Sequence, residues 1–372
     1  MNYYIIAGEA SGDLHASNLM KSITRLDGKA KFRCWGGDLM QAQGGVLVKH
    51  YRELAFMGFA EVLLNISTIL KNLKFCKKDI SENKPDVLIL VDYPGFNLRI
   101  ADFAKKKGIK VFYYISPQIW AWKQNRVHKI KRIVDKMFVI LPFEEDFYAR
   151  FNYKVDYVGH PLLDAIEEFN TTKLPFEEFT KKHKLGSKPI VAILPGSRKQ
   201  EISKMLEIML SISPFYANYQ FVIARAPSID AEFYSTFIKQ GDVKIISNST
   251  YELLQHSTAA LVTSGTATLE TALFEVPQVV CYSGGIISYT IAKALIKVKY
   301  ISLVNLVMDE KVVTELIQDD FNAENLKQQL DILLFNEQDK QRLSNKYKEL
   351  RKKLGNCGAS NKTASLMVNN LP

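Results

Sequence analysis

The sequence predicts an α/β protein built from two consecutive Rossmann-like domains that face a cleft. Three observations lead to this fold class. Short apolar runs rich in β-branched residues alternate with helical patterns along almost the whole chain, as in doubly wound parallel sheets. A polar segment near the middle interrupts this alternation, which then restarts. The length of 372 residues also suits two domains better than one.

The first half of the chain predicts a parallel sheet whose first strand covers residues 3–7. A turn of small residues follows, and the next helix, 13–25, carries Asp13 in its first turn, where the helix dipole favours an acid. The apolar run 86–91, between a proline and a Pro-Gly pair, predicts a strand buried on both faces. Further strands are expected at 31–35, 110–115, 136–140 and 155–158.

The domain boundaries follow from the interruption. Residues 163–188 are rich in Lys and Glu and contain Pro175 and Gly186, so they predict a helix end and a linker. Strands of the second domain are expected at 190–194, 221–224, 243–246, 260–263 and 278–282. The expected layout is an N-terminal domain at 1–165, a linker at 166–188, a C-terminal domain at 189–340 and a C-terminal helix at 341–372. That helix would pack on the first domain or on a second subunit, so a homodimer is one expected assembly.

The composition excludes several classes of protein. Hydrophobic residues form 47% of the chain and charged residues 24%, which is ordinary for a globular protein. The chain lacks an apolar stretch of the roughly 20 residues that span a bilayer, and the apolar run at its start is too short for a signal peptide. Four widely spaced cysteines predict neither a disulfide framework nor a zinc site and fit a reducing cytoplasm; they are Cys34, Cys76, Cys281 and Cys357.

The net charge of +10 favours an anionic partner such as a nucleotide, an anionic lipid or a nucleic acid. The basic runs are scattered between helical patterns, and they carry no recognisable DNA or RNA motif. We therefore expect no nucleic-acid partner.

Asp92 is the most informative single residue. It directly follows the run 86–91, so it is expected at the carboxyl end of a parallel strand, where open α/β sheets bind their ligands. A carboxylate on a loop held by a rigid strand can act as a general base. An aspartate that caps the next helix would occupy the same position. Position alone leaves both interpretations open.

A first turn in the second half predicts phosphate binding. Gly196, Ser197 and Arg198 follow the apolar run 190–194 and precede a helical pattern. The glycine lets a ligand approach the backbone closely, helix-terminal N–H groups face an anion, and an arginine can bind phosphate with paired donors. The alternative is an ordinary turn whose arginine forms a surface ion pair.

A second turn has the same strand–turn–helix pattern. It consists of Ser264, Gly265 and Thr266, and two such turns in one domain predict a site for a nucleotide diphosphate. Glu270 lies four residues after Thr266 and can accept hydrogen bonds from ribose hydroxyl groups, or it can be a surface acid favoured by the helix dipole. Since the chain has no dinucleotide-binding, P-loop or Asp-x-Asp motif, we expect no cofactor and no metal.

Residues 56–75 predict a helix at a membrane surface. Apolar residues at helical spacing would alone indicate an ordinary core face. Further apolar residues widen this stripe, and lysines follow directly, which is the pattern of an interfacial helix on anionic lipid. A buried helix with a solvated basic end is the alternative. The residues expected at the membrane surface are Met57, Phe59, Leu63, Leu64, Lys71 and Lys74.

Considered together, these motifs resemble those of the lipid-A-disaccharide synthase family. The resemblance extends from Gly8 to about Asn305, and its first segment and its Trp-Ala-Trp segment are not general Rossmann features. The matching segments are 8–13, 57–58 with 61–62, Asp92 with Pro94, Phe96 and Asn97, 116–122, 159–161, 195–198, 264–266 with Glu270, and Ser302-Leu303 with Asn305-Leu306.

The resemblance implies an inverting glycosyltransferase of the B-type (GT-B) fold. Its implied reaction transfers 2,3-diacylglucosamine from UDP-2,3-diacylglucosamine to the 6-hydroxyl of 2,3-diacylglucosamine 1-phosphate. The products are the β-1,6-linked disaccharide 1-phosphate and UDP. The resemblance further implies that Asp92 is the general base and that Arg198, Glu270 and Asn305 bind UDP.

The chain departs from the family pattern at two positions. Gly95 stands where some members carry a second acid, which leaves one acid in this loop, and Val304 stands where proline is common. We also expect Glu9, Ser11 and His160 in the cleft, near the acceptor. For His160, a structural histidine bonded to backbone is an equal alternative.

The implied substrates carry acyl chains and phosphates. The family therefore implies a cytoplasmic protein that associates peripherally with the anionic inner face of the cytoplasmic membrane. A UDP-N-acetylglucosamine epimerase or a peptidoglycan glucosaminyltransferase on the same fold is the alternative enzyme. Neither needs a surface for acyl chains, so the segment 56–78 argues against both.

Overall fold

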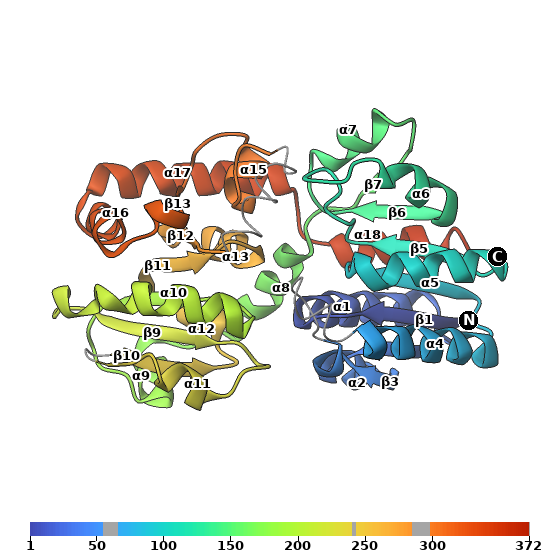
Figure 1. Cartoon of the computed structure of the whole chain (residues 1–372), viewed down its shortest axis with the longest axis horizontal. Helices are drawn as coiled ribbons and strands as arrows, with labels where there is room; N and C mark the ends of the chain where they lie inside the picture. The colour runs from blue at the N-terminus through green and yellow to red at the C-terminus, as the bar shows by residue number, and fades with distance from the viewer. Residues whose placement is uncertain (55–65, 240–242, 285–297, 372) are drawn as a thin grey trace. The chain divides into compact units, whose positions relative to one another are not determined.

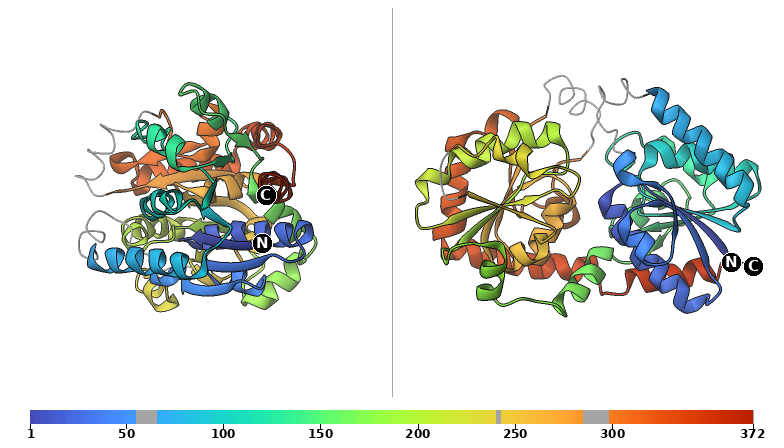
Figure 2. Two further views of the ribbon diagram at one scale, coloured as in Figure 1. Left: turned by 90° about the vertical axis from the view of Figure 1, so that its right-hand side faces the viewer. Right: turned by 90° about the horizontal axis from the view of Figure 1, so that it is seen from below.

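The computed structural model describes residues 1–54, 66–239, 243–284 and 298–371. The chain forms two compact units, of which the first comprises Met1–Asp164 with Asn356–Pro372 and the second comprises Ala165–Gly355. In each unit a parallel β-sheet carries helices on both faces (Figure 1 and Figure 2). The predicted α/β class with two Rossmann-like domains is confirmed.

The sheet of the first unit has the strand order β3-β2-β1-β4-β5-β6-β7, and neighbouring strands run parallel. The order reverses between β1 and β4, which is the switch point where doubly wound sheets open a crevice for ligands. The strands are β1 (Asn2–Ala7), β2 (Lys31–Gly36), β3 (Val46–His50), β4 (Val87–Val91), β5 (Lys110–Tyr114), β6 (Lys136–Val139) and β7 (Asp156–Tyr157).

Helices cover both faces of this sheet because its central strands are apolar on both sides. Every residue of β4 is fully buried. Helix α1 (Ala10–Leu26) contributes Ala16, Leu19, Met20 and Ile23, whose spacing places them on one face of the helix. The other helices of this unit are α2 (Asp38–Ala42), α4 (Ile66–Asn83), α5 (Pro94–Lys106), α6 (Arg126–Ile133), α7 (Glu144–Ala149) and α18 (Ala359–Val368).

The sheet of the second unit has the order β10-β9-β8-β11-β12-β13, again with parallel neighbours and with its switch point between β8 and β11. Its strands are β8 (Ile190–Leu194), β9 (Gln220–Arg225), β10 (Val243–Ser247), β11 (Ser257–Thr263), β12 (Gln278–Tyr282) and β13 (Thr314–Ile317). Its helices are α9 (Phe176–His183), α10 (Lys199–Ser211), α11 (Ala231–Ser235), α12 (Thr250–Gln255), α13 (Thr266–Leu273), α15 (Leu303–Met308), α16 (Ala323–Phe335) and α17 (Glu337–Leu354), and α8 (Pro161–Asn170) joins the two units.

The structure differs from the expected domain layout at the linker. Residues 166–188 are not a linker, because they form the second half of α8 and the helix α9. The ring of Phe179 is fully buried in the core of the second unit with Ile190 and Leu253. The Lys and Glu residues that suggested a linker are exposed, either on these short helices or in the turns beside them.

The C-terminal segment, expected as one helix at 341–372, contains two helices instead. The chain forms α17 in the second unit and then α18, which packs against α1 in the first unit. The carboxylate of Asp164 accepts hydrogen bonds from the N–H groups of Gly358, Ala359 and Ser360, at 2.5, 3.2 and 2.8 Å. Return to the first domain was one of the two expected alternatives.

Candidate active site

The carboxyl edge of the first sheet brings the turns around Glu9 and Asp92 together. β1 and β4 are neighbours at the switch point, so the turns that follow them lie side by side. A Cβ atom on Gly8 would lie 2.4 Å from Cγ of Tyr93, so only glycine permits this contact. Burial, together with the charge of Glu9, raises the pKa of Tyr93 to about 12. Ser11 is half-buried in the first turn of α1.

Asp92 lies in a strained turn. Its φ is +46° and that of Tyr93 is +49°, in the left-handed region that residues other than glycine rarely adopt. Each such residue costs on the order of 1–3 kcal/mol, and strained residues of this kind gather at active sites. Pro94 begins α5 and Tyr93 is its N-cap residue, so Asp92 stands one position before the cap. Asp92 is therefore not the N-cap residue of α5, and its role as general base stays a prediction.

Glu144 organises the loop 116–122, which follows β5 at the same edge of the sheet. Nε1 of Trp120 donates to Oε1 of Glu144 at 3.2 Å, and Oε2 accepts from the N–H groups of Ile140 and Leu141 at 3.1 and 2.9 Å. Burial raises the pKa of Glu144 to about 7, although these hydrogen bonds act in the opposite direction. In contrast to the buried Trp120, Trp122 is exposed.

Two residues of the family motifs have structural roles. Asp13 is buried and accepts hydrogen bonds from three N–H groups at the start of α2, at 2.7–3.1 Å. His160 is only 1% exposed, and its Nδ1 accepts from the N–H of Leu162 at 3.3 Å. Burial and the nearby His15 lower the pKa of His160 to about 3, so its ring is neutral at pH 7. These contacts match the structural alternative, and a contact between His160 and the acceptor stays a prediction.

The first phosphate-type turn lies at the switch point of the second sheet. Gly196 has a φ of +109°, and a Cβ atom there would lie 3.3 Å from Cγ2 of Thr263, on the neighbouring strand. Ser197 is exposed. Nη1 of Arg198 lies 2.8 Å from Oε1 of Glu201. This is the ion pair expected as the alternative, and a phosphate at this turn would compete with Glu201 for the guanidinium.

The second turn lies directly beside the first. The hydroxyl of Ser264 donates to the carbonyl of Ile301 at 2.8 Å, so it holds the segment that leads into α15. Gly265 has a φ of +152° and Thr266 is the exposed first residue of α13. β8 and β11 thus present two strand–turn–helix junctions side by side, as a diphosphate site requires.

Glu270 follows on α13 and is partly buried. Its Oε1 accepts a hydrogen bond from the hydroxyl of Tyr251 at 3.3 Å. Burial raises the pKa of Glu270 to about 7, and the bond from Tyr251 opposes this shift. When ionised, this carboxylate retains acceptor capacity for ligand hydroxyl groups.

Asn305 is a structural residue, which corrects its expected role in binding UDP. It is fully buried in α15. Its Nδ2 donates to the carbonyl of Val313 and to Oε1 of Glu315, and its Oδ1 accepts from the N–H groups of Val312 and Val313, each at 2.9 Å. All four hydrogen-bonding positions of the amide are therefore occupied by the protein itself.

The structure describes only part of the expected membrane surface. Met57, Phe59, Leu63 and Leu64 lie outside the described residues. In α4, Lys71 and Lys74 are exposed beside two large apolar side chains, Ile66 and Leu70, which are 53% and 59% exposed. Across the ranges that the structure describes, no helix has the length and apolar character to cross a bilayer, and no group of His, Cys, Asp and Glu side chains is arranged to hold a metal ion.

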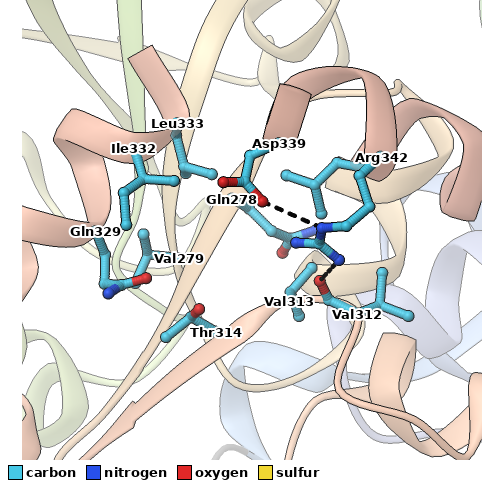
Figure 3. Close-up of a pocket in the computed structure, with 11 residues that line it drawn as sticks. Gln278, Val279, Val312, Val313, Thr314, Gln329, Ile332, Leu333, Asp339 and Arg342 are labelled. Atoms are coloured by element: carbon cyan, nitrogen blue, oxygen red, sulfur yellow. Dashed lines mark hydrogen bonds and ion pairs between the residues drawn. The ribbon is translucent and has the colours of Figure 1, made fainter. Parts of the chain in front are cut away.

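A small pocket lies at the opposite edge of the second sheet (Figure 3). Its volume is about 110 Å³, and it is lined by the first residues of β12 and β13, Gln278 and Thr314. Arg342 donates to Asp339 and to the carbonyl of Val312, each at 3.2 Å, so its charge already has partners. Because it lies at the amino ends of β12 and β13, the pocket is remote from the turns at the carboxyl edge.

Solved structures place this chain in a defined fold class. UDP-GlcNAc 2-epimerase from Neisseria meningitidis, solved bound to UDP-GlcNAc, has a TM-score of 0.71 at 13% identity, with all of both chains covered. The glycotransferase of kitacinnamycin has a TM-score of 0.65 at 12% identity, with 100% of this chain and 99% of that chain covered. At these identities the likeness shows the fold alone, which is that of the GT-B glycosyltransferases and the UDP-GlcNAc 2-epimerases.

Sequence comparison then defines the family. The family model of lipid-A-disaccharide synthetase matches residues 3–369. Lipid-A-disaccharide synthase of Geobacter metallireducens is 38% identical over 370 residues, covering 98% of this chain and 96% of the relative. That of Myxococcus xanthus is 37% identical over 377 residues, covering 99% and 97%. The chain belongs to the lipid-A-disaccharide synthetase family. The resemblance seen in the sequence, and with it the glycosyltransferase class, is confirmed.

Proposed function

We propose that this protein transfers 2,3-diacylglucosamine from its UDP donor to the 6-hydroxyl of 2,3-diacylglucosamine 1-phosphate. UDP and the β-1,6-linked disaccharide 1-phosphate would be the products. One observation carries the proposal: in a chain that matches this family from residue 3 to residue 369, Asp92 occupies a strained turn at the switch point of the first sheet.

In this reaction the carboxylate of Asp92 accepts the proton of the acceptor 6-hydroxyl. The hydroxyl oxygen attacks the anomeric carbon while the bond from that carbon to the diphosphate oxygen breaks on the opposite face. A single displacement of this kind inverts the anomeric centre. Glu9, on the turn beside Asp92, and Ser11, in the first turn of α1, are suited to contact acceptor hydroxyl groups.

The donor would be held at the carboxyl edge of the second sheet. The turns at 196–198 and 264–266 supply N–H groups at two helix starts, and Arg198 supplies paired donors for the diphosphate. As the sugar leaves, negative charge grows on the diphosphate, and these donors stabilise it. Glu270 would accept hydrogen bonds from the ribose.

The acylated substrates require a surface on the lipid. The exposed stripe of α4, with Ile66, Leu70, Lys71 and Lys74, is supported for this role by its mixture of apolar and basic side chains. We propose that it binds the anionic inner face of the cytoplasmic membrane and brings the protein to both substrates.

The test is acceptor-dependent UDP release by the purified protein, given both diacyl substrates in detergent with a chelator present. Asp92→Asn should lower kcat by about 10²- to 10⁴-fold, because general-base catalysis is lost. UDP affinity should stay within a few-fold of the wild type. Asp86→Asn is the matched control, since Asp86 adjoins the amino end of the same strand, where it accepts from the N–H of Asn2.

Two outcomes would contradict the proposal. Turnover of plain UDP-N-acetylglucosamine without use of the diacyl pair would leave an epimerase or another transferase on this fold. Full activity of Asp92→Asn would remove Asp92 from the role of base.

A further inference from the structure

The backbone carbonyl of Asp92 is held by two side chains from different elements. The hydroxyl of Tyr113, on β5, donates to it at 2.6 Å, and Nδ2 of Asn97, on α5, donates to it at 2.7 Å. Both donor residues are fully buried. The amide of Asn97 makes longer contacts to the carbonyls of Val91 and Ile6, at 3.3 and 3.5 Å, so its shortest bond is the one to Asp92.

These two hydrogen bonds hold a part of the backbone that is strained. Asp92 and Tyr93 are consecutive residues with positive φ, and Ile115, which directly follows β5, has a φ of +65°. A β-branched residue in this region is a genuine outlier, so both neighbouring turns at this edge are strained. Without fixed partners, the turn at Asp92 could relax toward an ordinary conformation and swing its carboxylate away from the edge of the sheet.

We propose that Tyr113 is a positioning residue, which, with Asn97, fixes the Asp92 turn so that its carboxylate is held for proton transfer. This inference rests on the proposed role of Asp92 as base. Burial and the nearby charge of Asp92 raise the pKa of Tyr113 well above its ordinary value, so its hydroxyl remains a donor. Glycosyl transfer needs a narrowly defined geometry, and a displacement of about 1 Å can reduce turnover on the order of 10²-fold.

The adjacent residue offers a matched control. Tyr114 is the next residue of β5 and is also fully buried, but its side chain points to the opposite face of the sheet. Its hydroxyl lies near Ser360 and Thr363 of α18, away from the Asp92 turn. Tyr113→Phe and Tyr114→Phe therefore each remove one hydroxyl from the same strand, and only the first removes a bond to Asp92.

We expect Tyr113→Phe to lower kcat by about 10- to 100-fold with KM within about twofold, because substrate binding does not depend on the carboxylate. Tyr114→Phe should keep the kcat of the wild type. Thermal unfolding of both variants, followed by circular dichroism, checks that each is folded. Equal kcat values for the two variants would overturn the proposal.

A double-mutant cycle separates positioning from a general structural effect. In the Asp92→Asn background, measured by long incubation with radiolabelled donor, Tyr113→Phe should have no further effect, because the group that it positions is gone. A further loss in that background would show that Tyr113 acts on the fold and would overturn the proposal. Full activity of Asp92→Asn alone would instead contradict the proposed base, so the two failures are distinguishable.

Discussion

At the scale of single residues, the carboxyl groups of this protein differ by what surrounds them. Asp92 precedes a helix cap in a strained turn, Asp13 is occupied by three backbone donors, and Glu144 is buried beneath the loop 116–122. Burial of Glu144 is the dominant influence on its pKa, which lies at about 7 instead of 4.5. Glu144 therefore makes stability depend on pH.

The sign of this pH dependence follows from the number of protons that the native and unfolded chains bind. Between about pH 4.5 and 7 the native carboxyl keeps a proton that the unfolded chain has released, so the free energy of unfolding falls as the pH rises through this window. The full shift corresponds to roughly 3 kcal/mol. Glu144→Gln mimics the protonated form, so its stability relative to the wild type should rise from pH 5 to 7.5 in urea titrations. Glu145→Gln, an exposed neighbour, controls for the lost charge, and parallel profiles for Glu144→Gln and the wild type would contradict the prediction.

Some single residues of the site were predictable from the sequence, and others were not. The positions of the turns at Asp92, Arg198 and Gly265 were predictable, because each turn directly follows a continuous apolar strand pattern. Asn305 was misassigned, because an amide that closes four internal hydrogen bonds has the same sequence signature as one that binds a ligand. Tyr113 was missed, because neighbouring tyrosines in a buried strand give no sign of which hydroxyl finds a partner.

At the scale of elements, carboxylates fix the starts of helices. Asp164, on α8, accepts from three consecutive N–H groups at the start of α18, although the helix lies almost 200 residues later in the chain. Such a cap also meets the positive end of the helix dipole. α18 packs on α1, so this cap helps to close the first unit.

We expect Asp164→Ala to destabilise α18 locally by about 1–2 kcal/mol, the usual effect of removing a cap. Hydrogen exchange measured by mass spectrometry should show faster exchange in peptides covering 359–368, while peptides from α17 stay unchanged. Asp164→Asn, which keeps one acceptor oxygen, should show a smaller effect. Unchanged protection of 359–368 in Asp164→Ala would contradict the role of the cap.

The strands that are buried on both faces were all predictable, and the elements that were missed are less buried. The central strands, such as β4 and β8, are continuous apolar runs and lie where expected. β3 and β13, two edge strands of mixed polarity, were missed, whereas the other two edge strands, β7 and β10, were predicted. The linker was expected because α9 is short and polar; Phe179 is its one buried residue, and the partly buried Phe176 packs against the same core.

At the scale of the whole molecule, the net charge of +10 and the stripe on α4 support binding to anionic lipid. A lysine near such a surface contributes about 1 kcal/mol. Lys71→Gln with Lys74→Gln should therefore weaken sedimentation with phosphatidylglycerol vesicles by roughly 30-fold, and added salt should weaken the wild type similarly. Lys348→Gln with Lys352→Gln on α17 removes the same charge from another exposed face and should change binding little. Equal losses for the two pairs would show that net charge, and not the stripe, governs binding.

The return of α18 to the first unit also has a consequence for biosynthesis. Ser22 of α1 donates to Asn361 of α18, a partner 339 residues later in the chain. At translation rates of about 5–20 residues per second, the roughly 190 residues of the second unit take on the order of 10–40 s to emerge. Throughout this interval the first unit waits on the ribosome with the α18-binding face of α1 uncovered. A nascent chain of this architecture therefore cannot complete its first unit until α18 has left the exit tunnel.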